Sequence, residues 1–513
     1  GDGDFDIKEK VERGLNILGV DETFTLPYLL ELLAVKDSGI DKIPMSPEAK
    51  KNRIMDAYKQ VALKGSEIRP LILAYEDLHW IDKSSEELLK YVLKSIPGAR
   101  ILLIFTYRPE FVHTWGARSY HSQVNLNRLS NRESLMMVSH LLRTEELDEN
   151  LEEFILEKTE GVPFFIEELI KSLKDLKIIE RENNRYRITK DVKEVTIPAT
   201  IQDVIMARVD SLPEETKSLL QTVSVVGRES SYDLIKRLTN LAEHELLSHL
   251  SVLKDSELLY ERGIYPQSTY VFKHALTQDV AYDSLLLKRR KEIHEEIGAV
   301  IEALYPDRLE EYHELLAYHY GRSVNADKAV MYLDLANQKA AKLNAMDEAK
   351  AYFDEAMVLL DALPETEENR QRRISLLVNQ GIVIMLLFKS SEYYKLLTRY
   401  EPMARDLGNP ELLGAFYARL GHCEFSFGNY DQAIRTVGKA VELCQATGNV
   451  GDAAYAYTFW EMSHLDRGDF ERVLALKDDV LRTVEHQFNL RFHTFALSIA
   501  ARAYACLGRW DEA

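Results

Sequence analysis

Two apolar runs, Leu71 to Tyr75 and Ile101 to Phe105, flank an amphipathic segment from Ser84 to Lys94. Uninterrupted runs of this length are typical of strands buried on both faces, as in parallel sheets. Ser84 and Glu87 have the spacing of a capping box, which predicts a helix start between the runs. The pattern therefore predicts a strand–helix–strand unit, and open sheets of this kind bind ligands at the carboxyl ends of their strands.

Beyond this unit, apolar residues recur at helical spacing along most of the chain. The helices that this spacing predicts cover residues 7–18, 26–35, 47–63, 130–142, 152–159, 201–209, 213–227, 232–238 and 242–254. Two strand-like runs, 258–261 and 269–272, come next and are joined by a loop that contains glycine and proline. Helices followed by a small hairpin predict a winged-helix domain, and a further long helix is expected after Phe272.

An internal repeat of 40 residues occurs near the end of the chain. It is marked by Gly428, Gly468 and Gly508, each followed two positions later by an aromatic residue. A glycine at a turn and an aromatic residue at the start of the next helix indicate a helix–turn–helix corner. Small residues such as Gly421 are expected where paired helices approach each other. The pattern predicts a solenoid of helix pairs that resembles tetratricopeptide repeats.

The composition of the 513 residues is that of a globular protein, with 46% hydrophobic and 29% charged residues. The net charge of −19 argues against affinity of the whole chain for nucleic acid or anionic membranes. The predicted third helix of the winged-helix domain carries Glu243, Glu245 and Asp255 against Lys254, so phosphates would repel it. The three cysteines form neither a disulfide framework nor a metal-binding set. The low cysteine usage fits a reducing cytoplasm. No apolar run approaches the ~18 residues of a membrane-spanning helix, so none is expected.

Glu76 and Asp77 directly follow the first predicted strand, and Arg108 follows the second. Beside the phosphates of a nucleotide triphosphatase, one such carboxylate holds Mg²⁺ and the next positions the attacking water. A solvated acidic loop explains two adjacent acids equally well, and Arg108 alternatively forms a salt bridge with Glu110. The longer string from Tyr75 to Asp82, YEDLHWID, is more specific.

This string, with Arg108 at the following strand end, resembles the Walker B motif of STAND-class P-loop ATPases, a branch of the AAA-related NTPases. The similarity extends to the ATPase and tetratricopeptide-repeat regions linked to bacterial class III adenylate or guanylate cyclases. It implies that Glu76 binds Mg²⁺, where the family usually has Asp. It also implies catalytic roles for Asp77, which acts on the attacking water, and for Arg108, which contacts the γ-phosphate.

Two further strings resemble nucleotide-binding motifs of the same family. Gly161-Val-Pro163 resembles the Gly-x-Pro motif that lies against adenine, and the string around His274 resembles the closing motif whose histidine touches the β-phosphate of ADP. The resemblance thus implies that Gly161, Pro163 and His274 bind ATP or ADP. From the residues alone, Pro163 is equally a helix starter, and His274 equally a hydrogen-bonded histidine without a ligand.

The expected fold is multidomain and mainly α. We expect residues 1–120 to be the C-terminal part of an α/β NTPase domain, and 121–195 to be a helical lid with the Gly-x-Pro motif. Residues 196–305 are expected to form the winged-helix domain, and 306–513 the tetratricopeptide-like repeats, truncated at the C-terminus.

The phosphate loop Gly-x-x-x-x-Gly-Lys-Ser/Thr does not occur in the 513 residues, so the β- and γ-phosphates lack their primary binding site. The chain starts at Gly1 rather than Met, and we expect the loop upstream. Residues 1–513 alone are predicted to be inactive as an ATPase. The expected function is a nucleotide-dependent signalling switch whose repeats bind a protein partner, with a fused cyclase domain as a candidate output. The alternatives are a non-enzymatic repeat scaffold with a vestigial NTPase domain and an ATP-dependent transcription activator.

Overall fold

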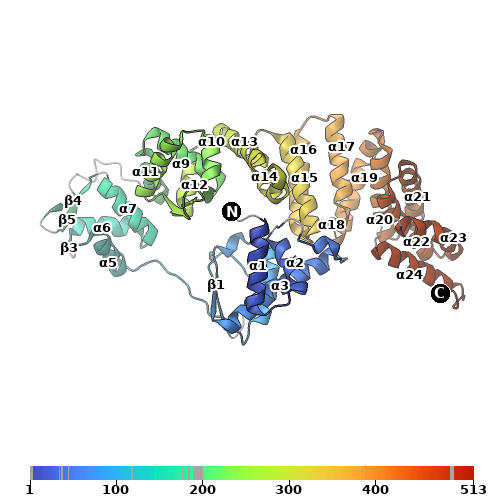
Figure 1. Cartoon of the computed structure of the whole chain (residues 1–513). Helices are drawn as coiled ribbons and strands as arrows, with labels where there is room; N and C mark the ends of the chain where they lie inside the picture. The colour runs from blue at the N-terminus through green and yellow to red at the C-terminus, as the bar shows by residue number, and fades with distance from the viewer. Residues whose placement is uncertain are drawn as a thin grey trace. The chain divides into compact units, whose positions relative to one another are not determined.

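The computed structural model is mainly helical and separates into two compact units (Figure 1). One unit includes His113–Tyr312 and Tyr318–Asn325, and the other includes Asp2–Val112, His313–Ala317 and Ala326–Ala513. The structure describes residues 4–33, 35, 38–43, 45–116, 120–144, 146–175, 177–182, 185–188, 200–387, 389–485 and 490–513.

The predicted strand–helix–strand unit is present in the second of these units. Its elements and those before it are α1 (Asp4–Leu18), α2 (Glu22–Leu32), η1 (Ile40–Lys42), α3 (Pro47–Ile68), β1 (Leu71–Tyr75), η2 (Leu78–Trp80), α4 (Lys83–Ser95) and β2 (Ile101–Phe105). Strands β1 and β2 pair in parallel, with Leu71 opposite Ile101 and Tyr75 opposite Phe105. The predicted helix cap was wrong, because Asp82 rather than Ser84 accepts the hydrogen bond from the Ser85 amide at the start of α4.

The prediction that both faces of these strands are buried was also wrong. Side chains on one face of the sheet are exposed, with fractions of 68% for Ile72, 55% for Leu102 and 43% for Ile104. Only two strands form this sheet among the described residues, and no described element covers that face. A parallel sheet normally needs helices on both faces, so the apolar pattern of β1 and β2 calls for more cover than the described residues provide.

The other unit contains helices and two small sheets. Its elements are α5 (Asn131–Leu142), β3 (Glu146–Leu147), α6 (Glu149–Thr159), α7 (Pro163–Asp175), β4 (Ile179–Glu182), β5 (Arg185–Ile188), α8 (Ile201–Asp210), α9 (Glu214–Val226), β6 (Glu229–Ser231), α10 (Tyr232–Thr239), α11 (Glu243–Asp255), β7 (Leu259–Arg262), β8 (Thr269–Phe272), α12 (Ala275–Asp283), α13 (Leu287–Leu304) and η3 (Pro306–Tyr312). Ser130 and Glu133 form the predicted capping box of α5. Helix α14 (His313–Gly321) has residues in both units.

The segment expected to be a helical lid contains helices α5 to α7, together with a three-stranded sheet of β3, β5 and β4 that was not predicted. The long helix expected after Phe272 is interrupted: α12 ends at Asp283, and α13 begins at Leu287. Helices α8 to α11 and the antiparallel hairpin of β7 and β8 match the predicted order of helices and strands. Strand β6, which was not predicted, joins the hairpin as a third strand beside β8. The assignment to the winged-helix class stays a prediction.

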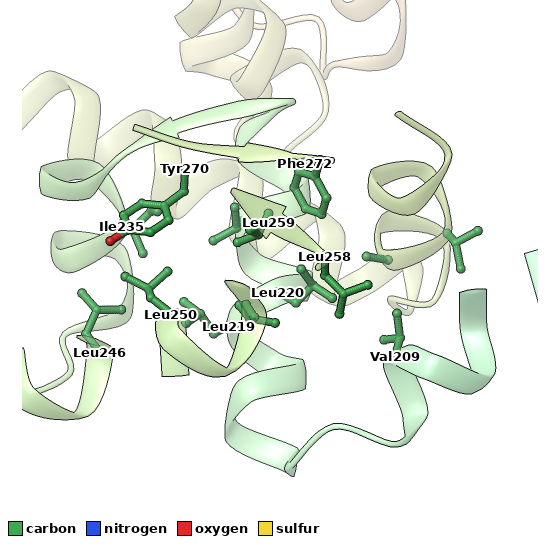
Figure 2. Close-up of a cluster of buried hydrophobic side chains, with 14 of the residues drawn as sticks. Val209, Leu219, Leu220, Ile235, Leu246, Leu250, Leu258, Leu259, Tyr270 and Phe272 are labelled. Atoms are coloured by element: carbon green, nitrogen blue, oxygen red, sulfur yellow. The ribbon is translucent and has the colours of Figure 1, made fainter. Parts of the chain in front are cut away.

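The core of this region is formed by apolar side chains from its helices and from the hairpin. Figure 2 shows Leu219, Leu220, Leu250, Leu259 and Phe272 turned toward one another from α9, α11, β7 and β8, and all are at most 2% exposed. The side chain of Phe164, from α7, packs against this cluster, and Ile201 at the start of α8 packs against both this core and the core around α5 to α7. Phe164 and Ile201 therefore connect the core around α5 to α7 with the core around the hairpin.

The C-terminal helices follow one another as hairpins (Figure 1). They are α15 (Ala326–Lys342), α16 (Met346–Ala362), α17 (Glu367–Asn379), α18 (Gly381–Leu386), α19 (Ser390–Asp406), α20 (Pro410–Ser426), α21 (Tyr430–Thr447), α22 (Val450–Arg467), α23 (Phe470–Glu485) and α24 (Leu490–Cys506). The predicted corners are confirmed at Gly428 and Gly468, where φ is 76° and 93°. Gly421 lies where α20 meets α21, and a Cβ atom there would lie 2.3 Å from Cγ2 of Val437. These features are consistent with the expected helical solenoid.

Candidate functional site

The parallel pairing of β1 and β2 brings the predicted acids and the segment before Arg108 to one edge of the sheet. The Thr106 amide donates to the Tyr75 carbonyl (3.0 Å), and the Leu78 amide donates to the Thr106 carbonyl (2.9 Å). The Asp77 amide in turn donates to Oγ1 of Thr106 (2.9 Å). These bonds hold Asp77 in the left-handed region at φ 56°, an uncommon conformation for a residue other than glycine. The backbone of the acidic turn is therefore fixed to the end of the neighbouring strand.

Arg108 is exposed at the same edge of the sheet, and its guanidinium lies over the indole ring of Trp80, 5.7 Å from the ring centroid. Among the described residues it forms no ion pair, so the alternative salt bridge with Glu110 is not formed in this conformation. An arginine held only by a weak contact with an exposed ring is available for an anionic ligand.

The carboxylates of Glu76 and Asp77 could supply some, but not all, of the oxygen ligands that a hard cation such as Mg²⁺ needs. The Glu76 side chain is exposed and the Asp77 side chain is half-buried, as expected for carboxylates beside a ligand pocket. Mg²⁺ in nucleotide sites is commonly held by one or two carboxylates together with phosphate oxygens and water. Within the described ranges, no group of three or more metal-binding side chains occurs. The two acids thus fit a metal that a bound phosphate also coordinates, rather than a metal site made by the protein alone.

Gly161 occupies the turn between α6 and α7, as predicted, and the structure gives a reason for glycine there. Its φ is +73°, and a Cβ atom would lie 2.2 Å from the carbonyl oxygen of Leu129. The Leu129 amide donates to the Gly161 carbonyl (2.8 Å), so two backbone segments are in direct contact. Pro163 is the first residue of α7 and its side chain is exposed. This geometry requires glycine whether or not a ligand binds.

His274 precedes α12, and its ring packs against the ring of Phe164, with centroids 3.9 Å apart. Its Nε2 atom is buried and has no hydrogen-bond partner among the described residues. Burial lowers the pKa of His274 below its usual range, so the imidazole is neutral near pH 7. A neutral imidazole can still donate one hydrogen bond, which a phosphate oxygen could accept. The partner Phe164 belongs to the same string as Pro163 and was not predicted as a site residue.

The predicted site residues fall into two groups. Glu76, Asp77 and Arg108 belong to one compact unit, whereas Gly161, Pro163 and His274 belong to the other.

Separately from both groups, helices α10 and α13 form a surface groove of about 660 Å³. The lining residues of this groove, which include Lys236, Arg237 and Ala299, contain none of the predicted site residues.

The similarity of this chain to known proteins is low in identity or limited to part of the chain. The model of a domain of unknown function, DUF8739, matches residues 130–187, which run from the cap of α5 to β5. A curated relative, an uncharacterised protein of Rhizobium meliloti, is 22% identical over 326 residues, which are 62% of this chain and 30% of the relative. The chain thus spans about a third of the length of that relative.

Two solved structures are similar to this chain at low identity. One is a signal transduction ATPase with numerous domains (STAND) and a tetratricopeptide repeat sensor from Pyrococcus horikoshii, at 14% identity and a TM-score of 0.36, covering 90% of this chain and 69% of that chain. The other is aspartyl phosphate phosphatase F from Bacillus subtilis, at 12% identity and a TM-score of 0.28, covering 62% of this chain and 84% of that chain. Within the residues that the structure describes, no helix is both long and apolar enough to cross a membrane.

Proposed function

We propose that this chain is part of a nucleotide-dependent signalling switch, in which a helical solenoid that binds a protein partner is linked to an ATP- or ADP-binding region. The proposal is supported chiefly by one observation. Two parallel strands place Glu76 and Asp77 at the end of one strand and Arg108 after the end of the next, with Thr106 bonded to the acidic turn. The carboxyl ends of parallel strands are where open α/β sheets bind their ligands.

In this proposal, Mg²⁺ and the phosphate loop belong to the complete nucleotide domain, and the loop lies outside residues 1–513. Glu76 would hold the Mg²⁺ ion, whose charge would neutralise the phosphate oxygens. Asp77 would accept a hydrogen bond from the attacking water and orient it, and Arg108 would leave the Trp80 ring to pair with the γ-phosphate. The exposed apolar face of β1 and β2, with Ile72 and Leu102, supports the view that further elements of the domain cover it.

The second group of residues would contact a bound nucleotide through its adenine and its β-phosphate. The backbone of Gly161 and the ring of Pro163 would contact adenine, and Nε2 of His274 would donate to a β-phosphate oxygen. The unpartnered, buried Nε2 atom supports this role, because a bound oxygen acceptor would satisfy it. The solenoid would favour one nucleotide state by binding its partner, and each binding event would then bias the other by the same free energy. A fused adenylate or guanylate cyclase domain is the output that we propose to look for.

The test is ATP hydrolysis by the complete natural chain that contains these residues. The Asp77→Asn variant should keep ATP binding within about threefold and lose at least about 100-fold in turnover, since it removes the group that orients the water. The matched control is Glu110→Gln, an exposed acid in the loop after the same strand edge, which should keep turnover within about twofold. Turnover unchanged by Asp77→Asn would exclude Asp77 as the hydrolytic residue.

A natural chain that carries no phosphate loop and binds no ATP would refute the switch and favour the repeat scaffold. Measurement of ATP binding by calorimetry on residues 1–513 alone is a second test. Because these residues lack a backbone cradle for the phosphates, we expect weak binding or none, and submicromolar affinity would contradict the assigned role of the loop.

A further inference from the structure

Four charged side chains form a closed ring beside His274. Lys171 and Lys273 each contact both Glu167 and Glu257, so every member of the ring pairs with at least two opposite charges. Lys171 also lies 3.9 Å from the buried carboxylate of Glu168. The distance from Nζ to the carboxylate oxygen is 3.1 Å for Lys171 with Glu167, 3.1 Å for Lys273 with Glu167 and 2.7 Å for Lys273 with Glu257. The fourth contact joins Lys171 and Glu257.

The ring joins three segments that are distant in sequence. Glu167 and Lys171 lie one turn apart on α7, Glu257 follows the end of α11, and Lys273 follows the end of β8. Lys273 is also the residue before His274, whose ring rests on Phe164 of α7. The same ring of charges thus holds the segment that carries His274 to the helix that carries its aromatic partner.

The electrostatics favour the charged, closed arrangement. Hydrogen bonds from Lys171 and Lys273 lower the pKa of Glu257 to about 2. Burial alone would raise the pKa of Glu167, but hydrogen bonds from the two lysines lower it overall. Burial alone would likewise lower the pKa of Lys273, but its bonds to the two glutamates raise it overall. Glu167, Glu257 and Lys273 are therefore ionised at neutral pH while the ring is closed.

The ring can also open without leaving buried charges unpaired. The exposed fractions of its side chains run from 24% for Lys171 to 51% for Glu257, so water can solvate each group once the contacts break. The neighbouring pair of Glu168 and Arg208 differs, because these side chains are 2% and 9% exposed. Separating that pair would leave two buried charges without a partner of opposite charge, which is strongly unfavourable. Glu168 and Arg208 therefore anchor α7 to α8, and the ring is the releasable contact.

We propose that Glu167, Lys171, Glu257 and Lys273 form an electrostatic latch that holds the Lys273–His274 segment against α7 and controls whether His274 stays packed on Phe164. Its role in gating a phosphate-bearing ligand rests on the proposed function, but the latch itself needs no nucleotide. A phosphate group that approaches His274 would compete with the two glutamates for Lys273 and so favour opening.

The latch is tested by hydrogen–deuterium exchange of the whole 513-residue chain without nucleotide. Two amides report on the latched segment: the Lys273 amide donates to the Leu258 carbonyl, and the Thr277 amide donates to the His274 carbonyl, each at 3.1 Å. Raising NaCl from 50 mM to 1 M should speed exchange at both amides by roughly 5- to 20-fold, because salt screens partly exposed charges. Amides of α20 and α21 should change by less than about twofold, since the close contact of Gly421 with Val437 between these helices involves no charged group.

Glu257→Gln should show fast exchange at these amides already in 50 mM NaCl, with little further effect of salt. Lys273→Arg keeps the charge and should retain the slow exchange of the wild type. The matched control is Asp210→Asn, which removes a 2.7 Å pair with Lys217 outside the ring and should leave both amides unchanged. The latch is refuted if wild-type exchange at Lys273 and Thr277 does not respond to salt, or if Glu257→Gln exchanges as slowly as wild type. Either result would leave the ATP-hydrolysis test of the proposed function unaffected.

Discussion

Glu461 offers a direct test of how burial acts on a charged group in the solenoid. It lies on α22 with an exposed fraction of 0%, and neither carboxylate oxygen has a hydrogen-bond partner among the described residues. Burial raises its pKa from 4.5 to about 8. The folded protein therefore holds this carboxyl group in its neutral form at pH 7, whereas the unfolded chain releases the proton.

The size of the effect follows from that difference in pKa. Well below pH 4.5 the carboxyl group is protonated in both the folded and the unfolded state, so it adds no pH dependence to the stability. As the pH rises from 4.5 to about 8, folding takes up a proton, and stability falls by about 1.4 kcal/mol per pH unit. At pH 7 the interval is about 2.5 units, so ionisation of Glu461 in the unfolded chain costs the fold about 3 kcal/mol.

The Glu461→Gln variant keeps the shape of the side chain and cannot lose a proton. Its stability relative to wild type should rise by about 3 kcal/mol between pH 4.5 and pH 7 and then level off above about pH 8. Any constant cost of burying the amide changes the stability of the variant by the same amount at every pH. The slope of stability against pH is therefore diagnostic. The measurement is urea unfolding followed by circular dichroism at a series of pH values.

The matched control is Glu442→Gln, an exposed position on the neighbouring helix α21. Its stability relative to wild type should vary by less than about 0.5 kcal/mol over the same pH range. If wild type and Glu461→Gln gave parallel pH profiles, the carboxyl group would not be buried in its neutral form on α22.

Three glycine substitutions test the backbone geometry by the same urea assay. Gly161→Ala should destabilise by at least about 2 kcal/mol, because φ is positive and the new Cβ atom would collide with the Leu129 carbonyl oxygen; unchanged stability would contradict the close approach of these two segments. Gly421→Ala should destabilise by about 1–3 kcal/mol, since Val437 leaves no space between α20 and α21, and a neutral effect would show that these helices lie farther apart. Gly438→Ala, within helix α21, meets only ordinary contacts and should stabilise by about 0.5–1 kcal/mol; a loss of stability there would mean that the site is more crowded than described.

Local signals in the sequence were enough for most elements. The capping box of Ser130 and Glu133 depends on residues within one turn of helix, and Gly428 and Gly468 mark corners through their own backbone conformation. The two apolar runs correctly predicted parallel strands with Glu76 and Asp77 at one end. They did not predict the exposed face of Ile72 and Leu102. An apolar pattern shows which side chains need to be covered, but not whether other parts of the chain cover them.

Other features depend on segments that are distant in sequence and were decided only by tertiary structure. The strand partners within the lid, the contact of Gly161 with Leu129 and the packing of Phe164 on His274 each join separate elements. The charged ring around Lys273 gives no sequence signal, since lysines and glutamates on helices are usually solvated. The sequence thus determined where most helices and turns lie, because those choices depend on neighbouring residues. The fold alone decided which charges and rings meet, because these contacts form only when distant segments pack.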